Sequence, residues 1–140
     1  MITVGPSTTR DERMAWDPDE AVELARRPEP DESSTVATAM YDQLAAAGVT
    51  VEAVEMCIVF WSRALDGLDP GPVSAERLAR LDRDLELEHG TSPVLARWLT
   101  ALRRRVSTAH DLDWTIRFLM QVQQTWRMSL AFASRRPVNS

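Results

Sequence analysis

The chain has 140 residues, of which 44% are hydrophobic and 26% are charged, with a net charge of −5 and a single cysteine. This composition predicts one globular domain whose core needs no disulfide. The negative charge disfavours nucleic acid and anionic membranes as partners. The longest apolar run, residues 56–61, is too short to cross a bilayer, and the N-terminus has no signal-peptide pattern. We therefore expect a cytoplasmic protein.

Residues 1–16 show no hydrophobic periodicity, so we expect a flexible N-terminal arm followed by a single helical domain over residues 17–136. The sequence DPDE at 17–20 predicts the start of a short helix. Aspartate caps the first N–H groups, proline suits the first turn, and glutamate three residues later completes a capping box. A second helix is predicted over about 34–47, ending at Gly48.

The strongest pattern in the chain is the apolar stretch over residues 51–65. One helical face is formed by residues that recur at steps of three and four, and they are Val51, Val54, Ile58, Trp61 and Leu65. Much of the opposite face is also apolar, including Met56 and Val59. A helix that is apolar on nearly all sides is expected at the centre of a domain. A buried strand over 56–61 is the alternative, but the face that continues to Leu65 favours a helix.

Three further helices complete the predicted fold. Ser74 begins one that ends at Gly90, and Ser92 begins another whose apolar face continues to Val106. After a polar connection, Asp113 is expected to cap a long last helix that continues to about Ser134. The sequence therefore predicts an all-α fold, a compact bundle of five to six helices around a central apolar helix at about 51–66.

The two histidines are the only candidates for catalytic chemistry. Glu86 and His89 have the Glu-x-x-His spacing of di-iron bundles, but two metal ions need a second such pair and further glutamates. His110 and Asp111 are adjacent and could act as an acid–base pair. His89, His110 and Asp111 are therefore weak catalytic candidates. We expect no metal site, because the chain has one such Glu-x-x-His pair only. We expect no cofactor, because the chain contains no phosphate-binding glycine loop.

Residues 90–99 resemble the turn and recognition helix of helix-turn-helix DNA-binding proteins. The resemblance implies that Arg97 and the run at 103–105 lie near the DNA. The preceding helix departs from the pattern, since Asp84 and Glu86 would face a polyanion. Intrahelical charge pairs account for the same residues. A DNA-binding regulator is therefore the third functional hypothesis, and nucleic acid is a disfavoured partner.

Aromatic residues supply the two leading hypotheses. Trp61, Trp98 and Trp126 each lie on an apolar face; they fit core packing, or a pocket for an apolar ligand in a small enzyme or binding protein. The last helix has a second apolar surface, formed by Trp114, Phe118, Met128 and Phe132. A protein partner explains such a surface better than the core does. We therefore expect a helical interaction or assembly module, either self-associating as a homodimer or forming a subunit of a larger complex.

Overall fold

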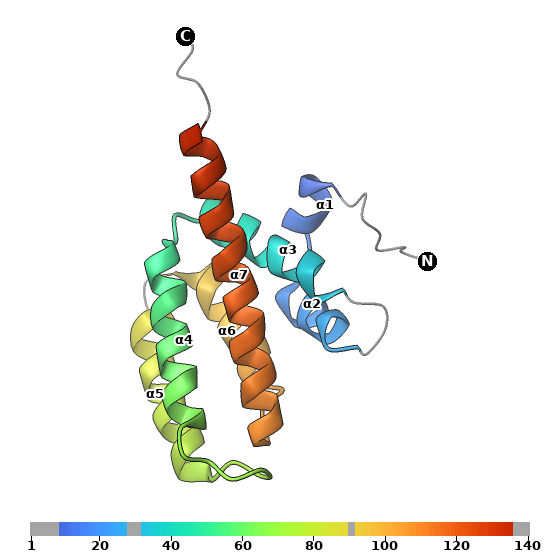
Figure 1. Ribbon diagram of the computed structural model, residues 1–140. Coiled ribbons are helices and arrows are strands. Elements are labelled where there is room, and N and C mark those ends of the chain that lie inside the picture. Colours follow the sequence, from blue (N-terminus) through green and yellow to red (C-terminus); the bar gives the residue numbers. More distant parts are fainter. Residues whose placement is uncertain (1–8, 28–31, 90–91, 136–140) are drawn as a thin grey trace.

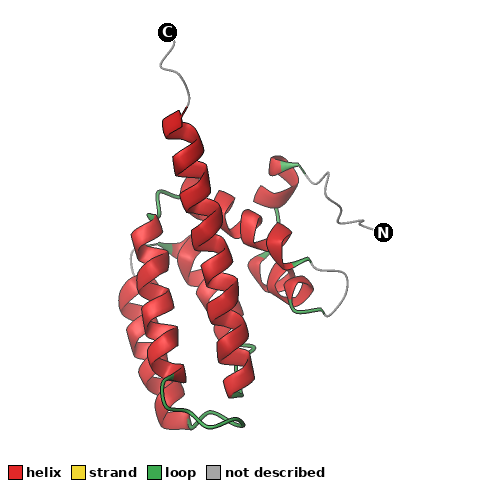
Figure 2. Cartoon of the chain, in the orientation of Figure 1, coloured by secondary structure: helices red, strands yellow, loops and turns green. Residues whose placement is uncertain are grey.

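The structure is a computed structural model that describes residues 9–27, 32–89 and 92–135. The regular elements in these ranges are all helices, joined by loops (Figure 2). In chain order they are α1 (Arg10–Met14), α2 (Pro18–Ala25), α3 (Ser33–Ala46), α4 (Val51–Leu65), α5 (Ala75–His89), α6 (Pro93–Arg103) and α7 (Ala109–Arg135). The predicted all-α class is confirmed, and residues 56–61 are helical within α4. The described part of the chain has seven helices, whereas five to six were expected, and the additional helix is α1.

Local capping fixes where several of these helices begin. Each cap residue accepts a hydrogen bond from the backbone N–H three residues later, which satisfies one of the unpaired donors of the first turn. The cap residues are Asp17, Thr50, Ser74 and Ser92, with donor–acceptor distances of 3.2–3.3 Å. The helix starts predicted at Asp17, Ser74 and Ser92 are confirmed, and α4 begins at Val51, where its apolar stretch begins.

The start of α7 differs from the prediction. The helix begins at Ala109, four residues before Asp113, because Thr108 and Asp111 form a reciprocal capping box. The Asp111 N–H donates to Thr108 Oγ1 at 3.2 Å, and the Thr108 N–H donates to Asp111 Oδ2 at 3.0 Å. Asp113 therefore lies inside the first turns, where it pairs with Arg117 at 3.0 Å.

The long α7 packs mainly against two helices. It lies against α4 on one side and α3 on another, while α5 packs against α4, and α2 packs against both α3 and α6 (Figure 1). Because α4 and α7 run in opposite directions, residues later in α4 meet residues earlier in α7. The last turns of α7 continue beyond the rest of the bundle (Figure 1). Their side chains therefore project past the core.

The position of α4 differs from the central one that its composition predicts. Its main contacts are with α5 and α7, and one of its faces is left open. Met56 and Val59 on that face are 41% and 40% exposed, while Val54 and Trp61 on the inner face are buried. The sequence shows that apolar residues surround the helix, but the neighbouring helices cover only part of its circumference.

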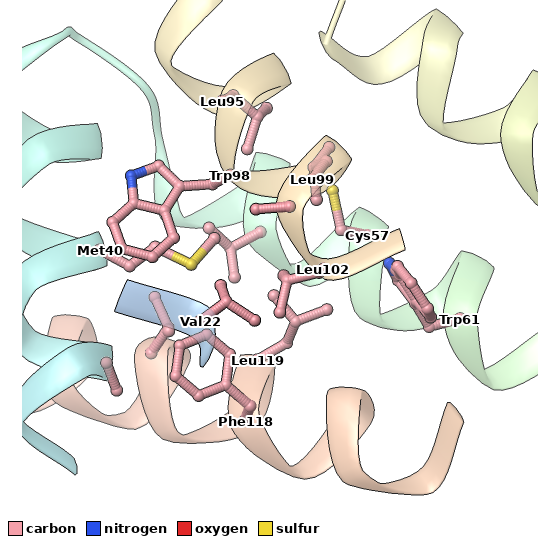
Figure 3. Packing of buried hydrophobic residues seen from close by; sticks show 14 of the residues in the cluster. Val22, Met40, Cys57, Trp61, Leu95, Trp98, Leu99, Leu102, Phe118 and Leu119 are labelled. Carbon is pink, nitrogen blue, oxygen red and sulfur yellow. The ribbon is translucent and has the colours of Figure 1, made fainter. Parts of the chain in front are cut away.

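The core lies between α3, α4, α6 and α7. Its largest fully buried side chains include Trp61, Trp98 and Phe118, with leucines of α6 and α7 between them (Figure 3). The apolar face predicted for the helix that begins after Ser92, which is α6, is buried from Leu95 to Val106. Burial of the apolar faces of α2 to α7 supplies the main stabilising free energy of such a domain.

A buried glutamine holds the N-terminal segment on the bundle. Residues 9–16, expected to belong to a flexible arm, include α1, which packs against α3. Gln43 Nε2 donates to the carbonyl oxygens of Arg13 and Trp16, both at 2.9 Å, and Gln43 Oε1 accepts from Trp98 Nε1 at 2.9 Å. The Arg13 guanidinium also pairs with Asp42 at 2.8 Å. These long-range bonds hold α1 on the bundle, although the segment has no apolar periodicity that would predict its packing.

Candidate interaction surface

The outer side of α7 carries exposed apolar side chains. Met120, Met128 and Phe132 are separated by multiples of four residues, so they form one ridge along the helix. Met128 and Phe132 are 64% and 67% exposed, and Leu130 on the opposite side of the same turns is also exposed. This last part of α7 projects beyond the bundle (Figure 1). The ridge is therefore available to another molecule along most of its length.

The open face of α4 continues this ridge. Glu55 accepts hydrogen bonds from Gln123 and Arg127 of α7, which fixes the register of the two antiparallel helices. One turn later along α4 is Val59, and one turn earlier along α7 is Met120. Met56, Val59 and Met120 therefore lie on the same side of the α4–α7 pair. We name the exposed apolar residues Met56, Val59, Met120, Met128 and Phe132 the α4–α7 surface.

Trp114 and Phe118, expected on the same surface as Met128 and Phe132, lie in a different environment. Phe118 is buried in the core, and Trp114 stacks on it with ring centroids 5.3 Å apart and planes 6° from parallel. The Arg26 guanidinium lies 5.0 Å from the centre of the Trp114 ring. Phe118 is thereby covered within the chain, whereas the later turns of α7 extend beyond the bundle.

The three candidate pocket tryptophans are all buried. Trp98 and Trp61 lie apart, with Leu99 and Leu102 between them (Figure 3). The Trp98 N–H is bonded to Gln43, whereas the Trp61 N–H has no hydrogen-bond partner among the described residues. Trp126 packs edge-on against Tyr41, with ring centroids 5.2 Å apart. Each indole therefore fills a separate part of the core.

Asp111 has a capping and pairing role in the structure. One of its carboxylate oxygens accepts from the backbone N–H groups of Ser107 and Thr108, and the other accepts from the Arg26 guanidinium at 2.6 Å. Burial alone would raise the pKa of this carboxyl. The backbone bond from Ser107, the Arg26 guanidinium and the Thr108 bonds outweigh burial and hold the pKa well below its usual range. A carboxylate held in this way is a poor proton acceptor.

The structure describes the side chain of one of the two candidate histidines, His110. The side chain of His110 is exposed at the start of α7. Its neighbour Asp111 directs both oxygens toward the loop and Arg26. The side chain of His89 lies outside the described part of the chain. The described residues contain no cluster of three or more His, Cys, Asp or Glu side chains that could hold a metal ion.

The arginines of the helix-turn-helix-like segment are paired with carboxylates. Arg97 pairs with Asp17 at 3.1 Å, and Arg103 pairs with Asp82 at 2.6 Å. Arg104 and Arg105 both contact Asp19, at 3.4 and 2.9 Å. The local charge of this helix is therefore largely balanced by α2 and α5.

Two of these ion pairs, Arg97–Asp17 and Arg104–Asp19, line a surface hollow between α2 and α6. This open hollow of about 320 Å³ is lined by Asp17, Pro18, Asp19, Ala96, Arg97, Thr100, Ala101 and Arg104. The hydrogen bond from Arg105 lowers the pKa of the Asp19 carboxyl, so the carboxylate stays charged. Among the described side chains, neither the candidate tryptophans nor His110 lines this hollow.

Comparisons of the chain with family models, with curated proteins and with solved structures found no match. None of the described helices combines the length and apolar character that crossing a membrane requires.

The α4 part of the surface was not identified from the sequence. The sequence pattern predicts that Met56 and Val59 lie inside a central helix, and Met120 lies off the main apolar face of α7. One signal was present, however. Glu52 and Arg63 occur on the same helical stripe as Met56 and Val59, and charged residues on a stripe indicate that it faces solvent.

Proposed function

We propose that this protein is a helical assembly module that binds a protein partner through the α4–α7 surface. The simplest partner is a second copy of the chain, and a different subunit of a larger complex is the other form of the same proposal. The observation that carries the proposal is the concentration of exposed apolar residues on two neighbouring helices.

The distribution of exposed apolar side chains supports this function. Among the described residues, the large hydrophobic side chains with the greatest exposure are Met14, Met56, Val59, Leu87, Met120, Met128, Leu130 and Phe132. Six of these eight belong to α4 or α7. Isolated apolar residues are normal on a protein surface, but a group of them along one helix pair is typical of a partner-binding face. Methionine side chains also adapt their shape to a partner.

The other two hypotheses have less support. A ligand-binding enzyme would need tryptophans or histidines around one cavity, whereas Trp61 and Trp98 are separated and His110 is exposed. A DNA-binding regulator would need arginines free to contact phosphates, whereas Arg97 and Arg103 are paired with Asp17 and Asp82. Neither hypothesis explains the exposed ridge on α7.

Glutamate substitutions at the end of α7 test the proposal. We expect the double variant Met128→Glu/Phe132→Glu to keep the helical circular dichroism of the wild type and to lose its assembly, because a charge at either position opposes burial. Sedimentation velocity across a concentration series measures the assembly. Leu87→Glu is the matched control, because Leu87 is an exposed apolar residue on α5. A double variant that assembles as tightly as Leu87→Glu would show that the end of α7 is not an interface.

A further inference from the structure

The open face of α4 carries a stripe of four exposed residues. Glu52, Met56, Val59 and Arg63 follow one another at steps of four, three and four, and each is exposed. Such steps keep residues on one line along a helix. The stripe therefore has an acidic end, an apolar middle and a basic end.

This order is self-complementary about a two-fold axis. The midpoint between Glu52 and Arg63 along the helix is also the midpoint between Met56 and Val59. A second α4 laid antiparallel across this midpoint therefore places Arg63 of the second copy opposite Glu52, and Val59 of the second copy opposite Met56. The rotation repeats both contacts, as a symmetric dimer interface requires.

The charges at the two ends of the stripe are available for such contacts. Within the described part of the chain, neither Glu52 nor Arg63 forms an ion pair. The Arg63 guanidinium lies 5.9 Å from the centre of the Phe60 ring. Arg127, the cation on the α7 side, pairs with Glu55 at 2.8 Å. The hydrogen bond to Glu55 is the main reason why the pKa of Arg127 is raised, and the charge of Glu52 raises it further by a smaller amount.

The neighbouring helix enlarges the contact. The rotation that lays α4 against its copy also brings α7 beside α7 of the second copy, because α7 is antiparallel to α4 and flanks it (Figure 1). Met120 then extends the apolar centre formed by Met56 and Val59. The result is a bundle of four helices, two from each copy, in which the face of α4 that the single chain leaves open is covered.

We propose that two copies of this chain associate through α4 in an antiparallel two-fold contact, centred on Met56 and Val59 and bounded by ion pairs between Glu52 and Arg63 of opposite copies. The inference rests on the proposed assembly function and identifies its partner as a second copy. It also explains why α4 has the composition of an enclosed helix. The helix becomes enclosed only when the second copy covers its outer face.

Charge exchange tests the register of this contact. Glu52→Arg and Arg63→Glu each replace two attractions in the dimer with two repulsions. We expect each single variant to raise the dimer dissociation constant at least about tenfold. The double variant Glu52→Arg/Arg63→Glu restores opposite charges at both ends, so its dissociation constant should return to within about threefold of the wild type. An equimolar mixture of the two single variants should likewise form a heterodimer.

The measurement is sedimentation velocity of the full chain over a concentration series, with circular dichroism to verify folding. Glu76→Arg is the matched control, because Glu76 is also an exposed acid in the first turn of a helix. Its dissociation constant should equal that of the wild type.

Three results would overturn the inference, and they separate it from the proposed function. A dimer unaffected by either single reversal would refute the α4 contact and leave the assembly function standing. If the single variants weaken the dimer and the double variant does not restore its dissociation constant, the antiparallel register would be refuted. A wild-type chain that is monomeric at every concentration would refute both the contact and self-assembly.

Discussion

Gln43 is the residue whose removal should most clearly separate the N-terminal segment from the bundle. Its side chain makes three hydrogen bonds of 2.9 Å, to the carbonyl oxygens of Arg13 and Trp16 and to the indole N–H of Trp98. Gln43→Leu keeps a side chain of similar size and removes all three bonds. The fully buried Trp98 N–H then has no acceptor.

The magnitude follows from these bonds. Each hydrogen bond contributes about 1 kcal/mol net to the free energy of unfolding, so three contribute about 3 kcal/mol. The carbonyl oxygens of Arg13 and Trp16 can bond to water once α1 moves, whereas the buried Trp98 N–H cannot. For 140 residues the entropy of unfolding converts about 3 kcal/mol into a decrease in Tm of roughly 10 °C.

A double-mutant cycle isolates the buried bond. Urea unfolding of Gln43→Leu, Trp98→Phe and the double variant, followed by circular dichroism at one protein concentration, gives the coupling free energy. We expect about 1 kcal/mol, because Trp98→Phe already removes the donor that Gln43 accepts from. The volume lost in Trp98→Phe cancels within the cycle.

Trypsin provides a second measurement, since Arg13 lies at the end of α1. Cleavage after Arg13 should be several-fold faster in Gln43→Leu than in the wild type, because α1 detaches more often. Trp98→Phe should leave this rate almost unchanged, since it preserves both bonds to the N-terminal carbonyl groups. A destabilisation below about 1 kcal/mol together with zero coupling would refute the role that we assign to Gln43.

Two further predictions concern local structure. Asp111→Asn should destabilise the fold by about 2 kcal/mol at pH 7, because it removes the charged partner of Arg26 and weakens the capping box. The folded-state pKa of Asp111 is lowered, so its stabilisation is present above the unfolded pKa of about 3.9 and is lost as pH falls through the folded pKa. The difference in urea stability between wild type and variant should therefore shrink below about pH 4, and a constant difference from pH 7 to pH 3 would contradict this. Gly48→Ala should cost about 1 kcal/mol in thermal unfolding, since φ is +82° and an added Cβ meets no atom within 4 Å. A loss above about 3 kcal/mol would indicate a steric clash that the structure does not contain.

The amino-acid sequence alone determined the helical class and most helix starts. A cap such as Thr50 or Ser92 acts on an N–H only three residues away, so its effect is visible in a short stretch of sequence. The apolar face of α6 was likewise predictable, because it repeats within one helix. The start of α7 differs from the predicted cap at Asp113 although its signal is local, because Thr108 and Asp111 have capping-box spacing.

Only the tertiary structure decided which faces are covered and which charges are paired. Periodicity reports that a face is apolar, but the number and position of neighbouring helices decide whether Met56 is enclosed or Phe118 is covered. The docking of α1 through Gln43, and the pairing of Arg105 with Asp19, join residues 27–86 positions apart. Such contacts depend on how the helices cross in space, and no pattern within a single helix contains that information.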